Sequence, residues 1–467
     1  MKTAFCGKTC FYTIIIAFTL MTTGCQNSVM TTNNQNSAMR IDGGFEDWKD
    51  VEILATDPKG DAKSVFDLTR VYAASGGSIL YLRFDAGSTV NLQNGPRREK
   101  TLLVKIGLPD DRQFVLDTRG RRAYLNDDSK ERIPWGQLKY IVGPTYAQDE
   151  FEIQIDLGKF DVKPGRSVSI QFDGSDQLSA PVSYTFSSPS IAPKRRSTGR
   201  LADTDVRVVS LNTFFGGLND EKRIDKIGRL LNFADADIYC FQEEWNTPDI
   251  DKVMNRLMPL ENGSQWNVHK VNRGSTVIAS KYPMKALPAS NNHYTVACIE
   301  IKGKRLYVIS IHLSAMGYIN SREDSSRLWQ SKEIMETIAG INNGQYDQGD
   351  LTSKPGIVIV GDFNLVGSRK PLDIMLDNKN DKLENWMVPN LIGESIITWS
   401  GAKPNASFTS GKLDYIVYSP ESLLPKNGFL LDSSLLNQTE LKQFKLNTDD
   451  SKATDHILII TDYQFLY

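Results

Sequence analysis

The chain has 467 residues, 40% of them hydrophobic and 24% charged, and its formal net charge is -2 at pH 7. This composition is typical of globular protein and excludes a wholly disordered chain, and the length is sufficient for two domains. The near-neutral charge gives no whole-chain argument for binding a polyanion, because nucleic-acid binders usually carry a basic surplus.

Residues 1–25 have the pattern of a bacterial lipoprotein signal peptide. Lys2 and Lys8 precede a short apolar run, CFYTIIIAFTLMTTG, which ends at Cys25 and is followed by polar residues. A lone cysteine at this place resembles a lipoprotein cleavage site, although Thr22 stands where leucine is commonest. We therefore expect an exported protein, anchored to a bacterial membrane through lipidated Cys25 and facing the periplasm or the cell exterior, with a flexible tether at 26–40. An uncleaved anchor and an ordinary signal peptide are the alternatives.

Residues 41–190 predict an all-β domain. Short apolar runs such as SILYLRF, TLLVKIGL and FEIQIDL alternate with Gly, Pro, Asp and Asn turns, and no helix is apparent. Many short strands at this spacing indicate a β-sandwich. The opening stretch, IDGGFEDWKDV, resembles the carbohydrate-binding or haem-binding sandwiches found beside secreted enzymes, so glycan binding and a spacer role are both open. Residues 191–205 predict an exposed linker in which Lys194, Arg195 and Arg196 are solvated.

Strands and helices alternate from residue 206 to residue 467. Apolar runs such as VRVVSLNTF, DIYCFQEEW, RLYVISIHL and GIVIVGDFN predict strands, and residues 322–339 predict an amphipathic helix. The domain should therefore combine parallel and antiparallel strands with covering helices. A further helix is predicted at 221–233, with one apolar face made of Ile224, Ile227, Leu230 and Leu231.

Two cysteines, Cys240 and Cys298, lie in strand-like apolar runs of the mature chain. In such runs a cysteine is usually a small buried hydrophobe, and a disulfide between the two is the less favoured alternative.

Polar side chains recur at the ends of the predicted strands of residues 206–467. If these strands form two packed sheets, their ends make one rim, and the polar side chains converge there. The residues concerned are Asn212, Glu243, His312, Asp362, Asn364, Asp414, Asp455 and His456.

These residue types fit the hydrolysis of a phosphoester. The reaction needs a cation against the phosphate charge, a polarised water and protonated donors on the non-bridging oxygens. Glu243 is the natural hard-oxygen ligand, and it suits Mg²⁺ or Mn²⁺ better than zinc, for which no cysteine or histidine cluster is present. Asp362 is placed to take a proton from the water, and Asn364, two residues on in an extended strand, to hold that water or the phosphate.

His456 needs a carboxylate partner to stay cationic beside a phosphoryl oxygen. Asp414 and Asp455 are the candidates, and because adjacent strand residues face opposite ways, Asp414 is the better partner and Asp455 is left to reach the metal. His312 is expected to be a second histidine donor. His269 and His293 lie outside every motif and are expected to be ordinary residues.

Six short motifs occur in a fixed order over residues 206–467: LNT at 211, FQEEW at 241, IHL at 311, GDFN at 361, LDYI at 413 and TDH at 454. They resemble the motifs of the endonuclease/exonuclease/phosphatase superfamily, typified by deoxyribonuclease I, exonuclease III and neutral sphingomyelinases. The resemblance implies a four-layer α/β/β/α sandwich and a metal-dependent hydrolase. It also implies site roles: metal or phosphate for Asn212 and Glu243, catalysis for His312 and His456, the base for Asp362, water or phosphate for Asn364, orientation of His456 for Asp414, and metal or support of that pair for Asp455.

One departure from the family concerns the first catalytic histidine. Secreted deoxyribonucleases give that histidine a glutamate partner, whereas the corresponding stretch KVNRGSTVIASKYP has no acidic residue and offers Arg273. For Arg273, phosphate contact and a surface role are both open. Many phosphatases and phosphodiesterases of the superfamily also lack the glutamate. The departure therefore argues against deoxyribonuclease-like specificity and not against activity.

The sequence thus predicts an exported, divalent-metal-dependent phosphoesterase, of nuclease, phosphodiesterase or phosphatase type, with a phosphodiester as the favoured substrate and a monomeric state. Extracellular nucleic acid, a phospholipid head group and a small phosphoester are all open, because residues 206–467 carry a slight acidic excess. Phe214, Phe215 and Trp245 suit stacking on a base, contact with a lipid or plain buried packing. The alternative function is a surface glycan-binding lipoprotein whose second domain is non-catalytic.

Overall fold

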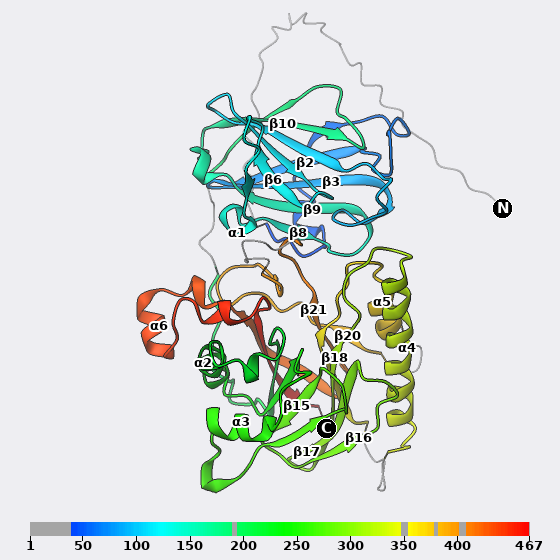
Figure 1. Cartoon of the computed structure of the whole chain (residues 1–467), viewed down its shortest axis with the longest axis vertical. Coiled ribbons are helices and arrows are strands. Elements are labelled where there is room, and N and C mark those ends of the chain that lie inside the picture. The colour runs from blue at the N-terminus through cyan, green and yellow to red at the C-terminus, as the bar shows by residue number, and fades with distance from the viewer. Residues whose placement is uncertain (1–38, 189–193, 347–353, 378–381, 401–407, 467) are drawn as a thin grey trace, which may run out of the picture. The chain divides into compact units, whose positions relative to one another are not determined.

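The computed structural model of the protein describes residues 39–188, 194–346, 354–377, 382–400 and 408–466 (Figure 1). The predicted signal peptide, Cys25 and most of the predicted tether lie outside these residues. Within the described ranges, no helix has the length and apolar character needed to cross a membrane.

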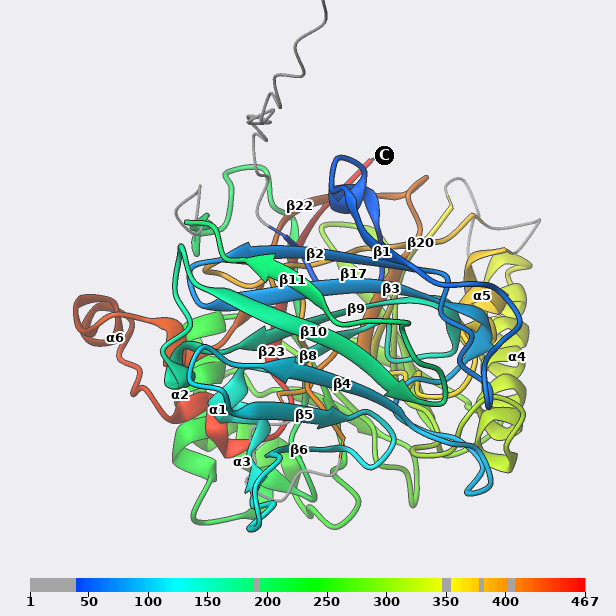
Figure 2. The same ribbon diagram turned by 90° about the horizontal axis from the view of Figure 1, so that it is seen from above.

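Two antiparallel sheets form the N-terminal part of the described chain, and Figure 2 shows their strands running along roughly the same axis. Buried and half-buried residues alternate along the strand at 102–107, the pattern of a strand with one face on a core. Both sheets contribute to one hydrophobic core, which confirms the predicted β-sandwich. One sheet has the order β1 (Ile53–Thr56), β2 (Arg70–Gly76), β3 (Ile79–Val90), β9 (Gln148–Asp156), β8 (Ile141–Gly143); the other has β11 (Val182–Thr185), β10 (Ser167–Gly174), β4 (Leu102–Gly107), β5 (Gln113–Asp117), β6 (Arg122–Leu125), β7 (Arg132–Ile133).

Two local predictions for this part of the chain need correction. A single helical turn, α1 (Trp135–Leu138), interrupts the strands and buries Trp135 and Leu138. Arg196 is not solvated, because its guanidinium donates to the carbonyl oxygens of Asn390 and Gly393 at 3.0 and 2.7 Å. The predicted linker is therefore attached to the C-terminal domain at this residue.

Two mixed sheets form the C-terminal domain. The pairs β12–β13 and β18–β19 are parallel, and the other ladders of these two sheets are antiparallel. The first sheet has the order β14 (Asn267–Lys270), β15 (Val277–Ser280), β13 (Ile238–Gln242), β12 (Val206–Asn212), β23 (Leu458–Phe465), β22 (Leu423–Leu431); the second has β16 (Met284–Leu287), β17 (Tyr294–Ile301), β18 (Lys304–His312), β19 (Gly356–Asp362), β21 (Asp414–Tyr418), β20 (Glu384–Asn385).

The two mixed sheets pack face to face, and helices cover their outer sides (Figure 1). The four residues predicted to share one helical face are all buried, against the first sheet. The helices of the second sheet pack on its outer core. These layers confirm the α/β/β/α sandwich. The helices are α2 (Ile224–Ala234), α3 (Ile250–Leu257) and α6 (Gln438–Phe444) on the first sheet, and α4 (Arg322–Asn342) and α5 (Lys370–Leu376) on the second.

The two described cysteines do not form a disulfide with each other. Cys240 lies in the core between the two mixed sheets, whereas Cys298 packs on the outer face of the second sheet. Burial raises the pKa of the Cys240 thiol, so it behaves as a small hydrophobe.

A buried ion pair joins β12 and β23, two neighbouring strands at the centre of the first mixed sheet. Arg207 Nε and Nη2 lie 2.6 and 2.8 Å from the two carboxylate oxygens of Asp462, and the Asp462 side chain is fully buried. Asp462→Asn should lower the free energy of unfolding by about 3–5 kcal/mol, because a buried guanidinium then lacks its carboxylate. Glu421→Gln, in an exposed pair with Lys354, is the control and should cost under about 1 kcal/mol. Chemical denaturation measures both, and an equal small loss would contradict the prediction.

Candidate active site

Strand order brings the predicted site residues to one rim of the sandwich. In the parallel pair β12–β13 the carboxyl ends meet at the same edge, and the same holds for β18–β19. In the second sheet His312 is in register with Asp362, and Asp362 with Asp414. Chain segments far apart in sequence therefore deliver their polar side chains to one place.

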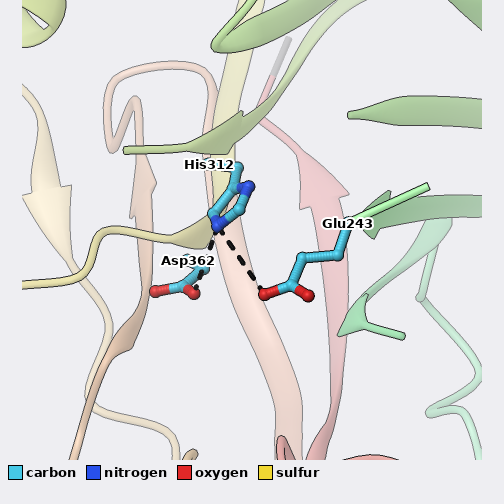
Figure 3. A group of neighbouring side chains, drawn as sticks. All are labelled: Glu243, His312 and Asp362. Carbon is cyan, nitrogen blue, oxygen red and sulfur yellow. Dashed lines mark ion pairs between the residues drawn. The ribbon is translucent and has the colours of Figure 1, made fainter. Parts of the chain in front are cut away.

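Three side chains form a group of potential metal ligands, drawn in Figure 3. His312 Nε2 lies 3.9 Å from Glu243 Oε1 and 3.8 Å from Asp362 Oδ2. One ligand atom from each of the three residues lies within 4.8 Å of the others. The group combines two carboxylates, the hard-oxygen ligands that divalent cations such as Mg²⁺ prefer.

Asn212 holds the two carboxylates together. Its Nδ2 lies 3.1 Å from Glu243 Oε1 and 3.2 Å from Asp362 Oδ2, and its Oδ1 accepts the Phe214 N–H at 3.0 Å. The amide therefore presents N–H groups, and not its oxygen, to the group. This differs from the predicted metal-ligand role: in this arrangement Asn212 fixes the ligands.

The backbone around Glu243 is strained. Glu243, Phe214 and Phe215 all have positive φ, at 65°, 56° and 51°. Residues with a side chain at such φ cost about 1–3 kcal/mol each and tend to occur at functional sites. In this conformation the Phe215 N–H donates to Glu243 Oε2 at 2.9 Å, and this bond fixes the carboxylate.

Two aromatic side chains are exposed beside the group. Phe215 is 69% exposed and Trp245 is 40% exposed, so the buried packing considered for them is wrong. Their ring centroids lie 5.8 Å apart, and Trp245 lies 5.5 Å from the His312 ring. A surface hollow of about 420 Å³ adjoins Phe215 and Asn246. This edge of the site is therefore open to a substrate with an apolar or planar part.

His456 is paired with Asp414, as predicted. Nδ1 of His456 lies 2.7 Å from Asp414 Oδ2, and its Nε2 lies 3.6 Å from Asp362 Oδ2. Burial alone lowers the pKa of this imidazole, but the charges of Asp414 and Asp362 outweigh burial and raise it. His456 is therefore protonated at neutral pH.

Asp362 and His312 are shifted by the same surroundings. Burial, with the nearby carboxylates of Asp414 and Glu243, raises the pKa of Asp362 against the opposing effect of His456. Burial and then the charge of His456 lower the pKa of His312 to about 4. The two histidines consequently differ at neutral pH: His312 is neutral, and His456 is cationic.

The partner of His312 is a hydroxyl that the sequence analysis missed. Ser275 Oγ lies 3.0 Å from His312 Nδ1, and Ser275 belongs to the stretch in which an acidic partner was sought. The side chain of Arg273, in the same stretch, is exposed. His293 contributes its carbonyl oxygen, which accepts the His312 N–H at 2.8 Å, and its side chain is outside the ligand group. Ser275 lies in the bend before β15, and no sequence signal distinguishes it from other serines in such connections.

The structure corrects the reasoning on Asn364. The strand β19 ends at Asp362, and Asn364 has a φ of 49°, so it is not in extended backbone. Asparagine tolerates this left-handed conformation better than most residues. Its N–H donates to Asp362 Oδ1 at 2.9 Å, and its Nδ2 donates to the Leu313 carbonyl at 3.1 Å. Asn364 still lies at the site, but it arrives there through a turn.

Asp455 does not belong to the ligand group. The group formed by described carboxylates and histidines at this rim contains Glu243, His312 and Asp362. The charge of Asp455 helps to raise the pKa of His456, and its carbonyl accepts the Ser400 N–H at 2.8 Å. The arrangement thus favours support of His456 over the predicted metal contact.

Comparison with known proteins identifies the family. A family model described as Endonuclease/Exonuclease/phosphatase family matches residues 209–456, more than half of the chain. The chain belongs to this family. Its members are typically metal-dependent phosphoesterases. A search of curated proteins found no match.

Solved structures also resemble the chain at low identity. The human Nocturnin catalytic domain with bound sulfate is 16% identical, with a TM-score of 0.37, and the match covers 57% of this chain and 96% of that one. A beta toxin from Staphylococcus aureus is 18% identical, with a TM-score of 0.36, 55% of this chain and 99% of that one. TDP2 from D. rerio, complexed with single-strand DNA product, is 13% identical, with a TM-score of 0.37, 56% of this chain and 98% of that one.

Proposed function

We propose that this chain is an exported, divalent-metal-dependent phosphoesterase that hydrolyses a phosphodiester bond. The observation that carries the proposal is the convergence of Glu243, Asp362 and the Asp414–His456 pair at one rim. A metal-ligand group beside a cationic, carboxylate-oriented histidine has the parts that attack at phosphorus requires.

The residues present fit a hard divalent cation. Glu243 and Asp362 supply carboxylates, both held by Asn212, and burial with like charges raises the pKa of Asp362. A bound cation would offset this concentration of negative charge, and Mg²⁺ or Mn²⁺ suits oxygen ligands. When bound, such an ion neutralises phosphate charge and acidifies water.

The side chains then divide the proton transfers. Asp362 accepts the proton of the attacking water, and Asn364 holds Asp362 through the N–H bond to its Oδ1. His456, cationic and oriented by Asp414, donates to a phosphoryl oxygen from Nε2. His312, neutral and held by Ser275, is the second donor, and its Nε2 lies 3.8 Å from the same Asp362 oxygen that faces His456.

The pairing of His456 gives a pH-dependent prediction. Asp414→Asn removes the negative charge that raises the pKa of His456, so that pKa should fall. Because His456 acts when protonated, the alkaline limb of the kcat profile should move to lower pH by about one unit or more. A pH series on a chromogenic diester measures the alkaline limb. An unmoved limb would show that deprotonation of His456 does not cause the loss of activity at high pH.

A substrate screen tests the proposed function. The purified protein without residues 1–25 would be assayed on bis-p-nitrophenyl phosphate, DNA, RNA, sphingomyelin and inositol phosphates, each with Mg²⁺, with Mn²⁺ and with EDTA. We expect metal-dependent turnover, with diesters cleaved faster than monoesters. No hydrolysis of any phosphoester, together with glycan binding by the N-terminal sandwich, would favour the alternative of a glycan-binding lipoprotein with a non-catalytic second domain.

Export and anchoring are proposed from the N-terminal sequence. The apolar run that ends at Cys25 motivates a lipid anchor there. Cells expressing the full chain should incorporate radioactive palmitate into it, and Cys25→Ser should abolish labelling of the protein. A Cys25→Ser chain that is labelled as strongly as the wild type would contradict the anchor.

A further inference from the structure

The N-terminal sandwich reaches the loops that carry the site residues. The described residues from Met39 onward belong to one compact unit, and several hydrogen bonds join the sandwich to the C-terminal domain within it. Three buried polar side chains of the sandwich take part, namely Asn91, Gln93 and Thr145, which are 2%, 3% and 6% exposed. Buried polar groups of this kind are retained where they have partners, so their partners indicate what they hold.

Asn91 joins two loops of the C-terminal domain. Its Nδ2 donates to the carbonyl oxygens of Val366 and Gly367, each at 3.0 Å. Its Oδ1 accepts the N–H of Ile319 at 2.7 Å. The first loop follows Asn364 and the second follows His312, so a single side chain links the loops on which both residues depend.

Thr145 joins the Asn364 loop to the segment that precedes Asp414. Its hydroxyl lies 2.8 Å from the Leu365 carbonyl and 3.0 Å from the Lys412 carbonyl. The N–H of Ala147, two residues further on, donates to the carbonyl oxygen of Gly367 at 2.7 Å. Three consecutive carbonyls of the Asn364 loop, those of residues 365–367, therefore accept donors from the sandwich.

Gln93 and strand β8 hold the same segment further upstream. Gln93 Oε1 accepts both the N–H and the hydroxyl of Thr409, at 3.0 and 2.5 Å. In β8 the Val142 N–H donates to the Ser410 carbonyl at 3.2 Å. The strand β21, which begins with Asp414, is thus entered through a segment fixed by the sandwich.

We infer that Asn91, Gln93 and Thr145 are positioning residues of the hydrolytic site, so that the sandwich is part of the catalytic scaffold. The inference rests on the proposed function and deepens it. The sandwich bonds converge on the loops around Asn364 and Asp414, which serve the general base and the His456 pair. Small displacements of such groups cost large factors in rate, because the reacting geometry is lost.

The scaffold should act mainly on the part of the site that the second sheet carries. Glu243 follows β13 of the first sheet, and its fixing contacts come from Asn212, at the end of β12 in the same sheet, and from Phe215 in the turn after β12. The sandwich bonds described above go to loops that follow or precede strands of the second sheet. A weakened scaffold is therefore expected to lower kcat. Because Asp362, one of the two proposed carboxylate ligands, ends a strand of the second sheet, the half-saturating metal concentration should also rise, but less than in a variant of Glu243.

Paired threonine variants test the inference. Thr145→Val keeps the shape and removes the hydroxyl, and Thr145→Ser keeps the hydroxyl. Thr118→Val is the matched control, because Thr118 is 3% exposed and its hydroxyl donates to the Leu102 carbonyl at 3.0 Å inside the sandwich. Below the unfolding temperature of each protein, we expect about a tenfold lower kcat for Thr145→Val, and near wild-type kcat for Thr145→Ser and Thr118→Val. Equal kcat in Thr145→Val and Thr118→Val would overturn the inference.

Hydrogen exchange provides a readout that does not need activity. In Thr145→Val, and in Gln93→Met, which preserves length and removes the acceptor of Thr409, amides of residues 362–368 and 409–415 should exchange faster. Amides of β12 and β13 should be unchanged. Faster exchange in those loops with an inactive wild type would reject the proposed function and retain the scaffold. Unchanged loop exchange would reject the scaffold, whatever the activity.

Discussion

His456→Ala and Asp362→Asn should each lower kcat by at least about a hundredfold, the usual scale for losing a general acid or base. Both side chains are buried at the rim, 4% and 2% exposed, and each faces the other across 3.6 Å. His456→Ala removes the donor that Asp414 orients, and Asp362→Asn removes the group that accepts the water's proton. Turnover of bis-p-nitrophenyl phosphate at saturating Mg²⁺ measures the loss.

The control for this prediction is a histidine outside the site. His269 lies in β14, away from the ligand group, so His269→Ala should leave kcat within about twofold of the wild type. The effects of His456→Ala and Asp362→Asn should also be far from additive in the double variant, since residues that act as a unit fail together. A His456→Ala protein that is folded and retains full kcat would remove His456 from the chemistry.

Glu243→Gln should raise the half-saturating Mg²⁺ concentration by at least about tenfold. Changes in groups that only orient a ligand already cost 10–100-fold in metal affinity, and Glu243 is proposed as a ligand itself. The glutamine preserves size and the acceptor for the Phe215 N–H, so the strained turn at residues 214–216 retains its bond. The His456 variant should differ, losing kcat with little change in its metal requirement.

A magnesium titration of activity, with direct binding measured by calorimetry, separates the two variants. Glu421→Gln, an exposed glutamate paired with Lys354, is the charge-matched control and should titrate like the wild type. If Glu243→Gln binds and uses Mg²⁺ with unchanged affinity, the cation is held elsewhere and the assignment of Glu243 is wrong.

Most of the C-terminal fold could be predicted from the sequence, because its central strands have a clear apolar pattern. The runs that became β12, β13, β18 and β19 are continuous and apolar, as expected for strands covered on both faces, and each ends in a polar residue. The helices α3, α5 and α6 were not predicted. They have seven or eight residues, too few for a clear helical period.

Side-chain direction accounts for the corrections at the site. Residue type and order identified Asn212, but only the structure shows that the Phe214 N–H occupies its oxygen and turns its amide nitrogen to the carboxylates. An offset of two suggested an extended strand through Asn364, whereas the chain turns there. Ser275 had no signal at all, because a serine in a bend before a strand has the same local pattern with or without a histidine beside it.

The role of the sandwich could not be predicted from local sequence patterns, for a different reason. Asn91 and Val366 are separated by 275 positions, and neither belongs to a motif. Periodicity reports which face of a strand is buried, and it does not report what a particular buried amide meets. The sequence therefore left a spacer role and glycan binding both open, whereas the hydrogen bonds favour a role in positioning the catalytic groups.

The most direct test of the account removes and restores the metal. The wild-type protein without residues 1–25 is treated with EDTA, freed of chelator, and assayed on bis-p-nitrophenyl phosphate before and after addition of Mg²⁺. The proximity of the Glu243 and Asp362 carboxylates predicts negligible turnover without metal and full recovery with it. Equal turnover in the metal-free and the Mg²⁺-restored protein would contradict the central claim.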